Sequence, residues 1–567
     1  MTLSKHVDAE QLEHRLLKLA TKTPVSDRDE YIFNYSSNNP VPKHQIPTKS
    51  SNSDLVLKYM EEELSLDGTP TLNMASFVNT AVEPNPLKLI CDNISKNLAD
   101  NDEYPSLLEH QARCMSILSD LWHAPKNKDG TTDTIGTSTT GSSEAVLLGG
   151  LALKKRWQEK RKAEGKSTEN PNIIMSSIAQ VALEKFARYF DVENRTIHIN
   201  EGSEHVLDVS KIKEQVDENT IGIFVILGST YTGNFESVEK VNAILDEIEK
   251  EKGLDVKIHV DAASGGFVAP FVYPNLKWDF AVPRVVSINT SGHKFGLTTA
   301  GLGWIIWKHS EYLPEQLRFK LDYLGGVEET FSLNFSRPGF PVLHQYYNFL
   351  AFGREGYTKI FDSCIQNTRL LSRYLEESGY YEVLSVIHRP LDEEESKRIF
   401  TLNKNDNSKL GKVAVANQGY RPGLPVVAFR FSEEFRNKYP GIPQAMISVL
   451  LRNKGFIVPN YNLSPDEHDK EILRAVIRPS CNLNLLEKLI QSITESTELL
   501  LKAHDTVMDI VSKKGAENEA ARKEMIHELL LSIASDGVID KKKAQTKLLD
   551  KEGTGHYKHK KSYRGTC

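Results

Sequence analysis

Three short segments carry residue types that could do carbonyl chemistry, and the first surrounds Lys294. The segment SINTSGHKFG, residues 287–296, has the pattern of an apolar strand that ends in Ser-Gly-His-Lys-Phe-Gly. Glycines on both sides of the lysine permit a tight backbone that other residues resist. A lysine amine held at the end of a strand is well placed to attack a carbonyl carbon. The alternative interpretation is a surface lysine in an ordinary turn.

The second segment, KIHVDAASGGF at residues 257–267, places Asp261 at the end of an otherwise apolar strand. A buried carboxylate is costly unless a positive group pairs with it. A protonated pyridine nitrogen is such a group, and pyridoxal-phosphate enzymes place an aspartate beside it. The alternative interpretation is an aspartate that caps a helix.

The third segment, TTGSSEAVLLGGLALKKRW at residues 139–157, places Ser142 and Ser143 immediately before an amphipathic helix. Free backbone N–H groups and two hydroxyls at a helix N-terminus form an anion site that would suit a phosphate. The alternative interpretation is a plain serine cap of the helix.

Together the three segments supply every part of a pyridoxal-phosphate site. Their order along the chain is phosphate site, aspartate and lysine, with 33 positions from Asp261 to Lys294. They correspond to the phosphate anchor, the partner of the ring nitrogen and the Schiff-base lysine. The residues therefore predict a pyridoxal-phosphate enzyme in which Lys294 carries the cofactor.

Strands and helices alternate around these segments from about residue 72 to 360. Apolar runs predict strands at 173–176, 221–227, 256–260, 285–288 and 304–307, and helical spacing predicts helices at 144–157, 181–190 and 238–251. Such alternation predicts a mostly parallel sheet covered by helices. Ligands of such sheets bind at the carboxyl ends of the strands.

The composition favours a cytoplasmic protein with no nucleic-acid or membrane partner. Of the 567 residues, 39% are hydrophobic and 26% are charged, and the formal net charge is −6. This charge gives no reason to expect nucleic acid, and no apolar run is long enough to span a membrane. The five cysteines are scattered, as in a reducing compartment. The 17 histidines show no metal-binding spacing, so no metal is expected.

Composition divides the chain into four segments. Residues 1–71 predict a polar N-terminal arm with a short helix at 8–20, and residues 72–364 predict a large cofactor-binding domain. Residues 365–505 predict a smaller C-terminal α/β domain, with a polar loop insertion at 391–423. Residues 506–567 predict a charged, partly helical tail.

The chain resembles the glutamate decarboxylases of bacteria, plants and fungi, which are pyridoxal-phosphate enzymes of the aspartate-aminotransferase fold, fold type I. The matching stretches are LNMASF (72–77), DEYP (102–105), DLWHAP (120–125), GSSEAVLLGG (141–150), KFARYFDVE (185–193), TYTGNFE (230–236), HVDAASGGFVAPF (259–271), SGHKFGL (291–297), DYLGG (322–326), NFSRP (334–338), REGYTKI (354–360) and LRAVIR (473–478). They run in family order, and the complete set is specific. The resemblance implies an α/β large domain with a mostly parallel sheet and a smaller α/β domain after it.

For the cofactor, the resemblance implies that Lys294 forms the Schiff base and that His293 contacts the phosphate and shields the substrate face. Asp261 and Ala263 would bracket the pyridine ring, Gln180 would cover one of its faces, and Thr230 would lie beside it. The phosphate would be held by Ser142, Ser143, Ser291 and, from a neighbouring subunit, Ser336.

For the substrate, the resemblance implies a carboxylate pocket lined by Ser76, Phe77, Asn97 and Asp100. Bacterial members carry threonine in place of Ser76, so the hydroxyl is retained. Arg474 would bind a carboxylate or order the site, and Tyr323 and Leu324 would lie on a mobile flap. Lys294, His293 and Tyr323 are candidate proton donors. Asn97 and Asp100 could instead be turn formers, and Arg474 a structural ion-pair partner.

The implied reaction converts L-glutamate to 4-aminobutanoate and carbon dioxide in a homodimer or higher homo-oligomer with shared active sites. One alternative is a pyridoxal-phosphate decarboxylase or lyase that acts on another amino acid. Another is an inactive scaffold that keeps the fold, although the intact Lys294, Asp261 and His293 argue against it.

Two interpretations of the tail stay open. Residues 525–539 are apolar on one face, and nine Lys and Arg against two acids lie between Lys541 and Cys567. An apolar helix beside a basic run can dock into an acidic groove as calmodulin targets do, and plant members of the family carry a calmodulin-binding tail. The other interpretation is a solvated or self-docking tail, because this segment lacks a tryptophan anchor.

Overall fold

The structure is a computed structural model that describes residues 44–100, 102–321, 328–400, 419–464 and 467–514, together with Arg15 and Ile526. The chain divides into two compact units, residues 1–72 with 538–567, and residues 73–537. The first unit contains helix α2 (Ser53–Leu64), which the sequence did not predict and which Asn52 caps, and the 3-10 turn η1 (Pro70–Leu72). Apart from Arg15, the helix predicted at 8–20 lies outside the described residues.

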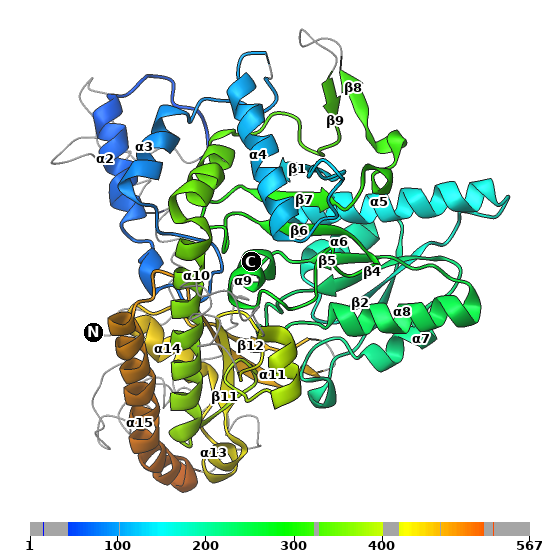
Figure 1. Ribbon diagram of the computed structural model, residues 1–567. Helices are drawn as coiled ribbons and strands as arrows, with labels where there is room; N and C mark the ends of the chain where they lie inside the picture. The colour runs from blue at the N-terminus through cyan, green and yellow to red at the C-terminus, as the bar shows by residue number, and fades with distance from the viewer. Residues whose placement is uncertain are drawn as a thin grey trace. The chain divides into compact units, whose positions relative to one another are not determined.

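A seven-stranded sheet forms the centre of the second unit, with the order β1-β7-β6-β5-β4-β2-β3 (Figure 1). Its strands are β1 (Ile135–Thr139), β2 (Asn172–Ser176), β3 (Glu193–Ile197), β4 (Thr220–Ile226), β5 (Ile258–Asp261), β6 (Val285–Ser291) and β7 (Gly303–Trp307). Only β7 runs antiparallel to its neighbours, which confirms the mostly parallel sheet. The strand predicted at 285–288 extends to Ser291. The last three residues, Asn289, Thr290 and Ser291, were missed because they are polar, although the structure buries them fully.

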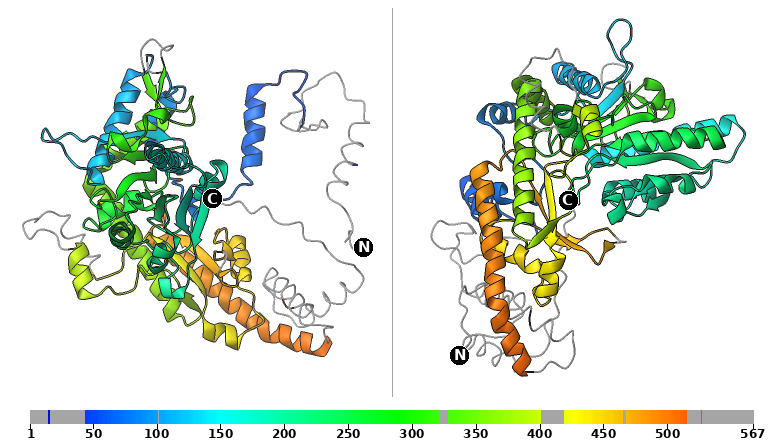
Figure 2. Two further views of the ribbon diagram at one scale, coloured as in Figure 1. Left: turned by 90° about the vertical axis from the view of Figure 1, so that its right-hand side faces the viewer. Right: turned by 60° about the horizontal axis from the view of Figure 1, so that its bottom comes forward.

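Helices cover both faces of this sheet (Figure 2). The α-helices of the second unit between residues 73 and 377 are α3 (Pro84–Asp92), α4 (Pro105–Leu121), α5 (Ser142–Ala163), α6 (Val181–Tyr189), α7 (Ile212–Gln215), α8 (Val238–Lys252), α9 (Gly265–Val272) and α10 (Phe340–Glu377). Alternate residues of β4 pack on opposite sides: Phe224 and Ile226 join the core against α5 and α6, and Ile223 and Val225 join the core on the other face. The described helices are all too short or too polar to traverse a lipid bilayer.

A second, fully antiparallel sheet follows, with the order β10-β11-β13-β12. Its strands are β10 (Tyr381–Val383), β11 (Val426–Phe431), β12 (Asn460–Asn462) and β13 (Glu471–Val476), accompanied by α13 (Glu433–Lys438), α14 (Ala445–Asn453) and α15 (Leu483–Lys514). Helix α10 bends at Gly353, whose φ is 55°, and its second half runs beside α15 (Figures 1 and 2). A small hairpin pairs β8 (Phe319–Leu321) with β9 (Glu328–Thr330).

Helix α11 (Glu393–Phe400) corrects the first part of the loop predicted at 391–423, of which residues 401–418 lie outside the described residues. Its first turn carries three glutamates and its last turn Lys397 and Arg398, which suits the helix dipole, and Asp392 accepts a hydrogen bond from the Glu395 amide at 2.8 Å. The charged residues that suggested a loop therefore form the exposed surface and the N-terminal cap of a helix. The division of the chain into four segments stays a prediction.

Candidate functional site

The residues predicted to bind the cofactor converge at the carboxyl edge of the large sheet. Asp261 is the last residue of β5, and Lys294 lies three residues after the end of β6. Helix α5 begins at Ser142, shortly after β1 ends. Strands β1, β5 and β6 run in the same direction, so their carboxyl ends meet at one edge, where ligands of α/β sheets bind.

Lys294 is held in a tight turn between two glycines. Its Nζ lies 3.4 Å from Ser264 Oγ and 5.5 Å from the centre of the Phe77 ring. A Cβ at Gly296 would lie 2.5 Å from the Gly292 carbonyl oxygen, and one at Gly292 would lie 2.7 Å from Leu302 Cδ2, closer than real side chains approach. The glycines are therefore needed for close packing around the lysine.

Asp261 is a buried carboxylate, 6% exposed, with one occupied and one open oxygen. Its Oδ1 accepts hydrogen bonds from Asn289 Nδ2 at 2.9 Å and from the Ala263 amide at 3.1 Å. No donor from the described residues reaches Oδ2. A buried carboxylate oxygen without a donor is costly, and the N–H of a pyridinium ring would fit this position.

The start of α5 is an open anion site. Gly141 precedes the helix and offers no side-chain cap, so the first backbone N–H groups have no cap partner. The hydroxyls of Ser142 and Ser143 make no hydrogen bond with any described residue. Ser291 Oγ, at the end of β6, is buried and has no hydrogen-bond partner among the described residues. These unpaired donors fit the phosphate of pyridoxal phosphate.

His293 presents an uncharged donor beside this anion site. Its Nδ1 accepts a hydrogen bond from the Leu302 amide at 3.2 Å, so the proton of the neutral ring resides on Nε2. Burial and the neighbouring charge of Lys294 lower the pKa of His293 to about 4. Its Cε1 would lie 3.4 Å from a Cβ at Gly141, which places the ring next to the start of α5.

Residues 73–80, named here the substrate segment, lie across the lysine turn. The Asn79 amide donates to the His293 carbonyl at 2.8 Å, and the Asn79 side chain donates to the Leu297 carbonyl at 2.9 Å. Ser76 Oγ accepts a hydrogen bond from the Val78 amide at 3.1 Å. These contacts place Ser76 and Phe77 beside the lysine turn, and their role in substrate binding stays a prediction.

Two buried arginines hold the substrate segment from the other side. Arg474, on β13, donates from Nη1 to the Thr230 carbonyl at 2.6 Å and from Nη2 to the Ala75 carbonyl at 2.5 Å. Its Nε is buried without a described partner, and its guanidinium carbon lies 5.0 Å from the centre of the Phe77 ring. Arg478 donates to the carbonyls of Asn73 and Val78 and to Thr80 Oγ1 at 2.7–2.9 Å.

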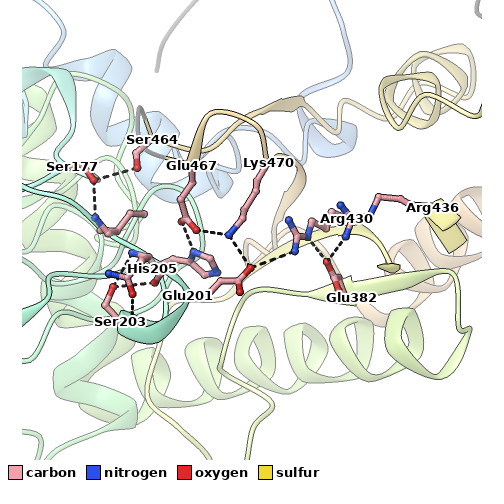
Figure 3. Close-up of polar contacts among 12 residues, drawn as sticks. Ser177, Glu201, Ser203, His205, Glu382, Arg430, Arg436, Ser464, Glu467 and Lys470 are labelled. Carbon is pink, nitrogen blue, oxygen red and sulfur yellow. Dashed lines mark hydrogen bonds and ion pairs between the residues drawn. The ribbon is translucent and has the colours of Figure 1, made fainter. Parts of the chain in front are cut away.

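A chain of polar contacts ties the small sheet to the large one (Figure 3). His205 Nδ1 lies 2.6 Å from Glu467 Oε2, and Lys470 Nζ joins Glu467 at 2.7 Å to Glu201 at 2.8 Å. Arg430, on β11, continues the chain from Glu201 at 3.7 Å. Because Glu467 and Lys470 lie within the four residues before β13, these contacts help to fix the strand that carries Arg474.

The remaining predicted residues are less closely joined to the lysine. Gln180 Oε1 caps α6 by accepting a hydrogen bond from the Ala182 amide at 2.7 Å. Asn97 Nδ2 donates to Ser336 Oγ at 3.3 Å, while no described contact joins either residue to Lys294. Asn97 Oδ1 accepts from the Ala99 amide, and the Asp100 amide donates to the Asn97 carbonyl at 3.3 Å, so both lie in a turn. Tyr323 and Leu324 lie outside the described residues.

Several site residues were not predicted. Ser264 contacts Lys294, Arg478 holds the substrate segment, and His259 with Asn289 forms a buried polar row beside Asp261. The row had a signal in the sequence, since polar residues at alternate positions of apolar strands share one face. Arg478 lies in the LRAVIR stretch, but its contacts had no local signal because its partners lie about 400 positions away. The described residues contain no group suited to a metal ion.

A lysine and an aspartate at adjacent strand ends, beside an open helix N-terminus, define a pyridoxal-phosphate enzyme of fold type I. The model of the pyridoxal-dependent decarboxylase conserved domain matches residues 53–391, and the chain belongs to this family. The resemblance inferred from the sequence is thereby confirmed, and the cofactor of the family is pyridoxal phosphate.

Relatives over most of the chain narrow the family further. The chain is 45% identical to a glutamate decarboxylase of Saccharomyces cerevisiae over 546 residues, 93% of this chain and 90% of that protein. It is 41% identical to glutamate decarboxylase 2 of Arabidopsis thaliana over 498 residues, 87% and 91% of the two chains. Among solved structures, a Lactobacillus brevis glutamate decarboxylase superimposes with a TM-score of 0.71 at 33% identity, covering 81% of this chain and 95% of that one.

Proposed function

We propose that the chain decarboxylates L-glutamate to 4-aminobutanoate and carbon dioxide, with Lys294 as the residue that carries the cofactor. The observation that carries the proposal is the position of Phe77, whose ring centre lies 5.5 Å from Lys294 Nζ and 5.0 Å from the guanidinium carbon of Arg474. A permanently charged guanidinium close to the lysine suits an amino acid with a second carboxylate. The relatives over most of the chain are glutamate decarboxylases, which supports the same substrate.

Pyridoxal phosphate, when bound, supplies an electron-poor ring that accepts the electrons of the Cα–carboxylate bond. Lys294 would hold it covalently, and Asp261 would keep its ring nitrogen protonated. Ser142, Ser143, Ser291 and the N–H groups of α5 would bind its phosphate. The substrate segment covers the lysine turn and limits the access of water, which favours a single orientation of the bond that breaks.

A proton must return to Cα after carbon dioxide leaves. His293 is neutral and carries its proton on Nε2, so donation from it would leave an imidazolate, which is unfavourable. We assign the donation to Lys294 Nζ or to the Tyr323 hydroxyl. The role of His293 is then to donate a hydrogen bond from Nε2 to an anionic group at the site.

Product analysis with a panel of amino acids tests the function. Glutamate is expected to be decarboxylated far faster than aspartate or aromatic amino acids, because a site built to hydrogen-bond one group rejects analogues that lack or misplace it. Faster turnover of tyrosine or histidine would favour a decarboxylase of another substrate class. A holoenzyme without turnover of any of them would favour an inactive scaffold.

We further propose a cytoplasmic homodimer or higher homo-oligomer with shared active sites. The four described cysteines are free thiols, which suits a reducing compartment. Asn97 and Ser336 form a pair without a described contact to Lys294 of the same chain, which suits a pair that serves a neighbouring subunit. Sedimentation analysis gives the subunit number. Mixed oligomers of Lys294→Ala and Ser336→Ala chains should recover activity if sites are shared.

For the tail we propose a regulatory or inert role outside the active site. Ile526, a described residue of the tail, is helical and 4% exposed and lies against Gly441, which favours self-docking. Helix α15 continues to Lys514, so a shortened chain should end there and not within the helix. This chain should retain cofactor and turnover, and loss of cofactor from the folded protein would contradict the proposal. Calcium-dependent binding of calmodulin to the full chain alone would favour the alternative.

A further inference from the structure

A buried row of polar side chains leads to Asp261 along β5 and β6. His259 lies two residues before Asp261 on β5, and Ser287 and Asn289 are the register partners of these two residues on β6. His259, Ser287 and Asn289 are each 0% exposed. Buried polar groups in native proteins are nearly always hydrogen-bonded, and these three residues bond to one another and to Asp261.

Each proton in the row has one consistent position. The Asp261 carboxylate only accepts, so Asn289 Nδ2 donates to Oδ1 at 2.9 Å. Asn289 Oδ1 must then accept from His259, whose Nε2 lies 2.7 Å away. His259 Nδ1 therefore carries the lone pair and accepts from Ser287 Oγ at 2.7 Å. This arrangement requires a neutral imidazole with its proton on Nε2.

The surroundings of His259 hold the ring in this state and place. Burial lowers the pKa of His259 to about 4, so the ring is neutral at physiological pH. Phe224 packs edge-on against the ring at 5.3 Å between centres. A Cβ at Gly149 of α5 would lie 2.5 Å from Cε1 of the ring. The helix that begins at the phosphate site thus needs glycine here to pass over His259.

We propose that His259 is a positioning residue for the cofactor aspartate, acting through the Asn289 amide. The proposal rests on the proposed role of Asp261 as the partner of the ring nitrogen. If the Asn289 amide were flipped, its oxygen would face Asp261 Oδ1 and repel the carboxylate. The His259 Nε2–H prevents this flip because it needs an acceptor. Oδ1 is then fixed by Asn289, and Oδ2 stays available for the ring nitrogen.

Three variants of the full chain separate this role from simple packing. His259→Gln keeps an N–H donor near the position of Nε2, whereas His259→Asn is too short to reach Asn289. Ser287→Ala removes only the hydroxyl that donates to Nδ1. The measurements are the dissociation constant of pyridoxal phosphate from the apoprotein, the pH dependence of the visible absorption of the holoenzyme, kcat and KM for glutamate, and the melting temperature of the apoprotein.

We expect His259→Asn to lower kcat about tenfold, because it loses one buried hydrogen bond. KM for glutamate should stay within about twofold of the wild-type value. His259→Asn should also weaken cofactor binding and shift the absorption profile. His259→Gln should restore cofactor binding and the absorption profile, although the apoproteins of His259→Gln and His259→Asn should have the same melting temperature. Ser287→Ala should give values between those of these two variants. If His259→Asn does not fold, Ser287→Ala carries the test. Asp261→Asn serves as the reference. If Asp261→Asn is impaired but His259→Asn has the spectrum and kcat of the wild type, the positioning role is overturned. Where only Ser287→Ala folds, the same result in that variant overturns it. If Asp261→Asn is unimpaired as well, the assigned role of Asp261 fails instead.

Discussion

The cofactor side and the substrate side of the site are built from different kinds of contact. On the cofactor side, Asp261 and Lys294 lie at the ends of neighbouring strands, and the register of β5 and β6 alone brings them together. On the substrate side, Arg474 and Arg478 reach carbonyls of the substrate segment 399 and 400 positions away in the sequence. The proposed cofactor side therefore depends on sheet register, whereas the proposed substrate side depends on a few long-range hydrogen bonds.

The two sides also differ in how they respond to pH. The cofactor side contains buried groups with shifted pKa values, since burial lowers the pKa of His293 and raises that of the Glu236 carboxyl. The substrate side is held by guanidinium groups, which stay charged at every physiological pH. A change of pH is therefore expected to act on the cofactor side first.

The largest expected effect is at Lys294. Lys294→Ala should abolish turnover, because it removes the amine that is proposed to hold the cofactor covalently. Borohydride reduction of the wild-type holoenzyme followed by peptide mass analysis should find the cofactor on Lys294. The exposed Lys240→Ala on α8 is the control and should behave as wild type. Cofactor attached to a different lysine would contradict the assignment.

The next effect is at Asp261. Asp261→Asn should keep pyridoxal phosphate bound through the phosphate site but lower kcat a hundredfold or more. An amide cannot balance the charge of the protonated ring, and loss of a partner of a buried charge costs about 3–5 kcal/mol. Steady-state kinetics and the absorption spectrum of the variant measure this effect. A rate near that of the wild type would remove the electrostatic role of Asp261.

The sequence predicted residues for the cofactor side and only some of those on the substrate side, for a physical reason. Lys294, Asp261 and Ser142 stand in short strand–turn or turn–helix motifs whose local pattern carries their geometry. The Arg478 contacts and the Asn97–Ser336 pair arise only when distant segments pack, so no local pattern announces them. Helix α11 was mistaken for a loop because its surface is charged, although its Asp392 cap and acidic first turn were present in the sequence.

A smaller effect concerns Glu236, whose carboxyl is buried among the ends of β2 and β4. Ser176 Oγ donates to it at 2.5 Å and the Ile226 amide at 2.7 Å, yet burial dominates and raises its pKa to about 7. The folded protein therefore binds this proton more tightly than the unfolded chain. Its stabilising contribution is complete below about pH 4.5 and is lost as the pH rises through about 7, to the extent of roughly 3 kcal/mol.

Glu236→Gln should remove this pH dependence, because the amide does not titrate. The measurement is the urea midpoint of wild type and variant between pH 5 and pH 8, at fixed protein concentration and saturating pyridoxal phosphate. As the pH rises, the urea midpoint of the wild type should fall relative to that of the variant, so that the difference between the two midpoints shrinks or changes sign. The exposed Glu247→Gln on α8 should parallel the wild type. A difference that does not vary with pH would show that Glu236 is ionised throughout.

The smallest expected effect is on the substrate side, at Arg478. Arg478→Gln removes three hydrogen bonds to Asn73, Val78 and Thr80 and should loosen the substrate segment without touching the strand ends. We expect KM for glutamate to rise about tenfold, or ~1.4 kcal/mol, with a smaller change in kcat and an unchanged absorption spectrum. The effect should be the same at pH 5 and pH 7, because no group on this side titrates between them, and the exposed Arg452→Gln should leave KM unchanged. A fall in kcat with an altered spectrum and unchanged KM would mean that the two sides are not separable, since loosening one would then have displaced the other.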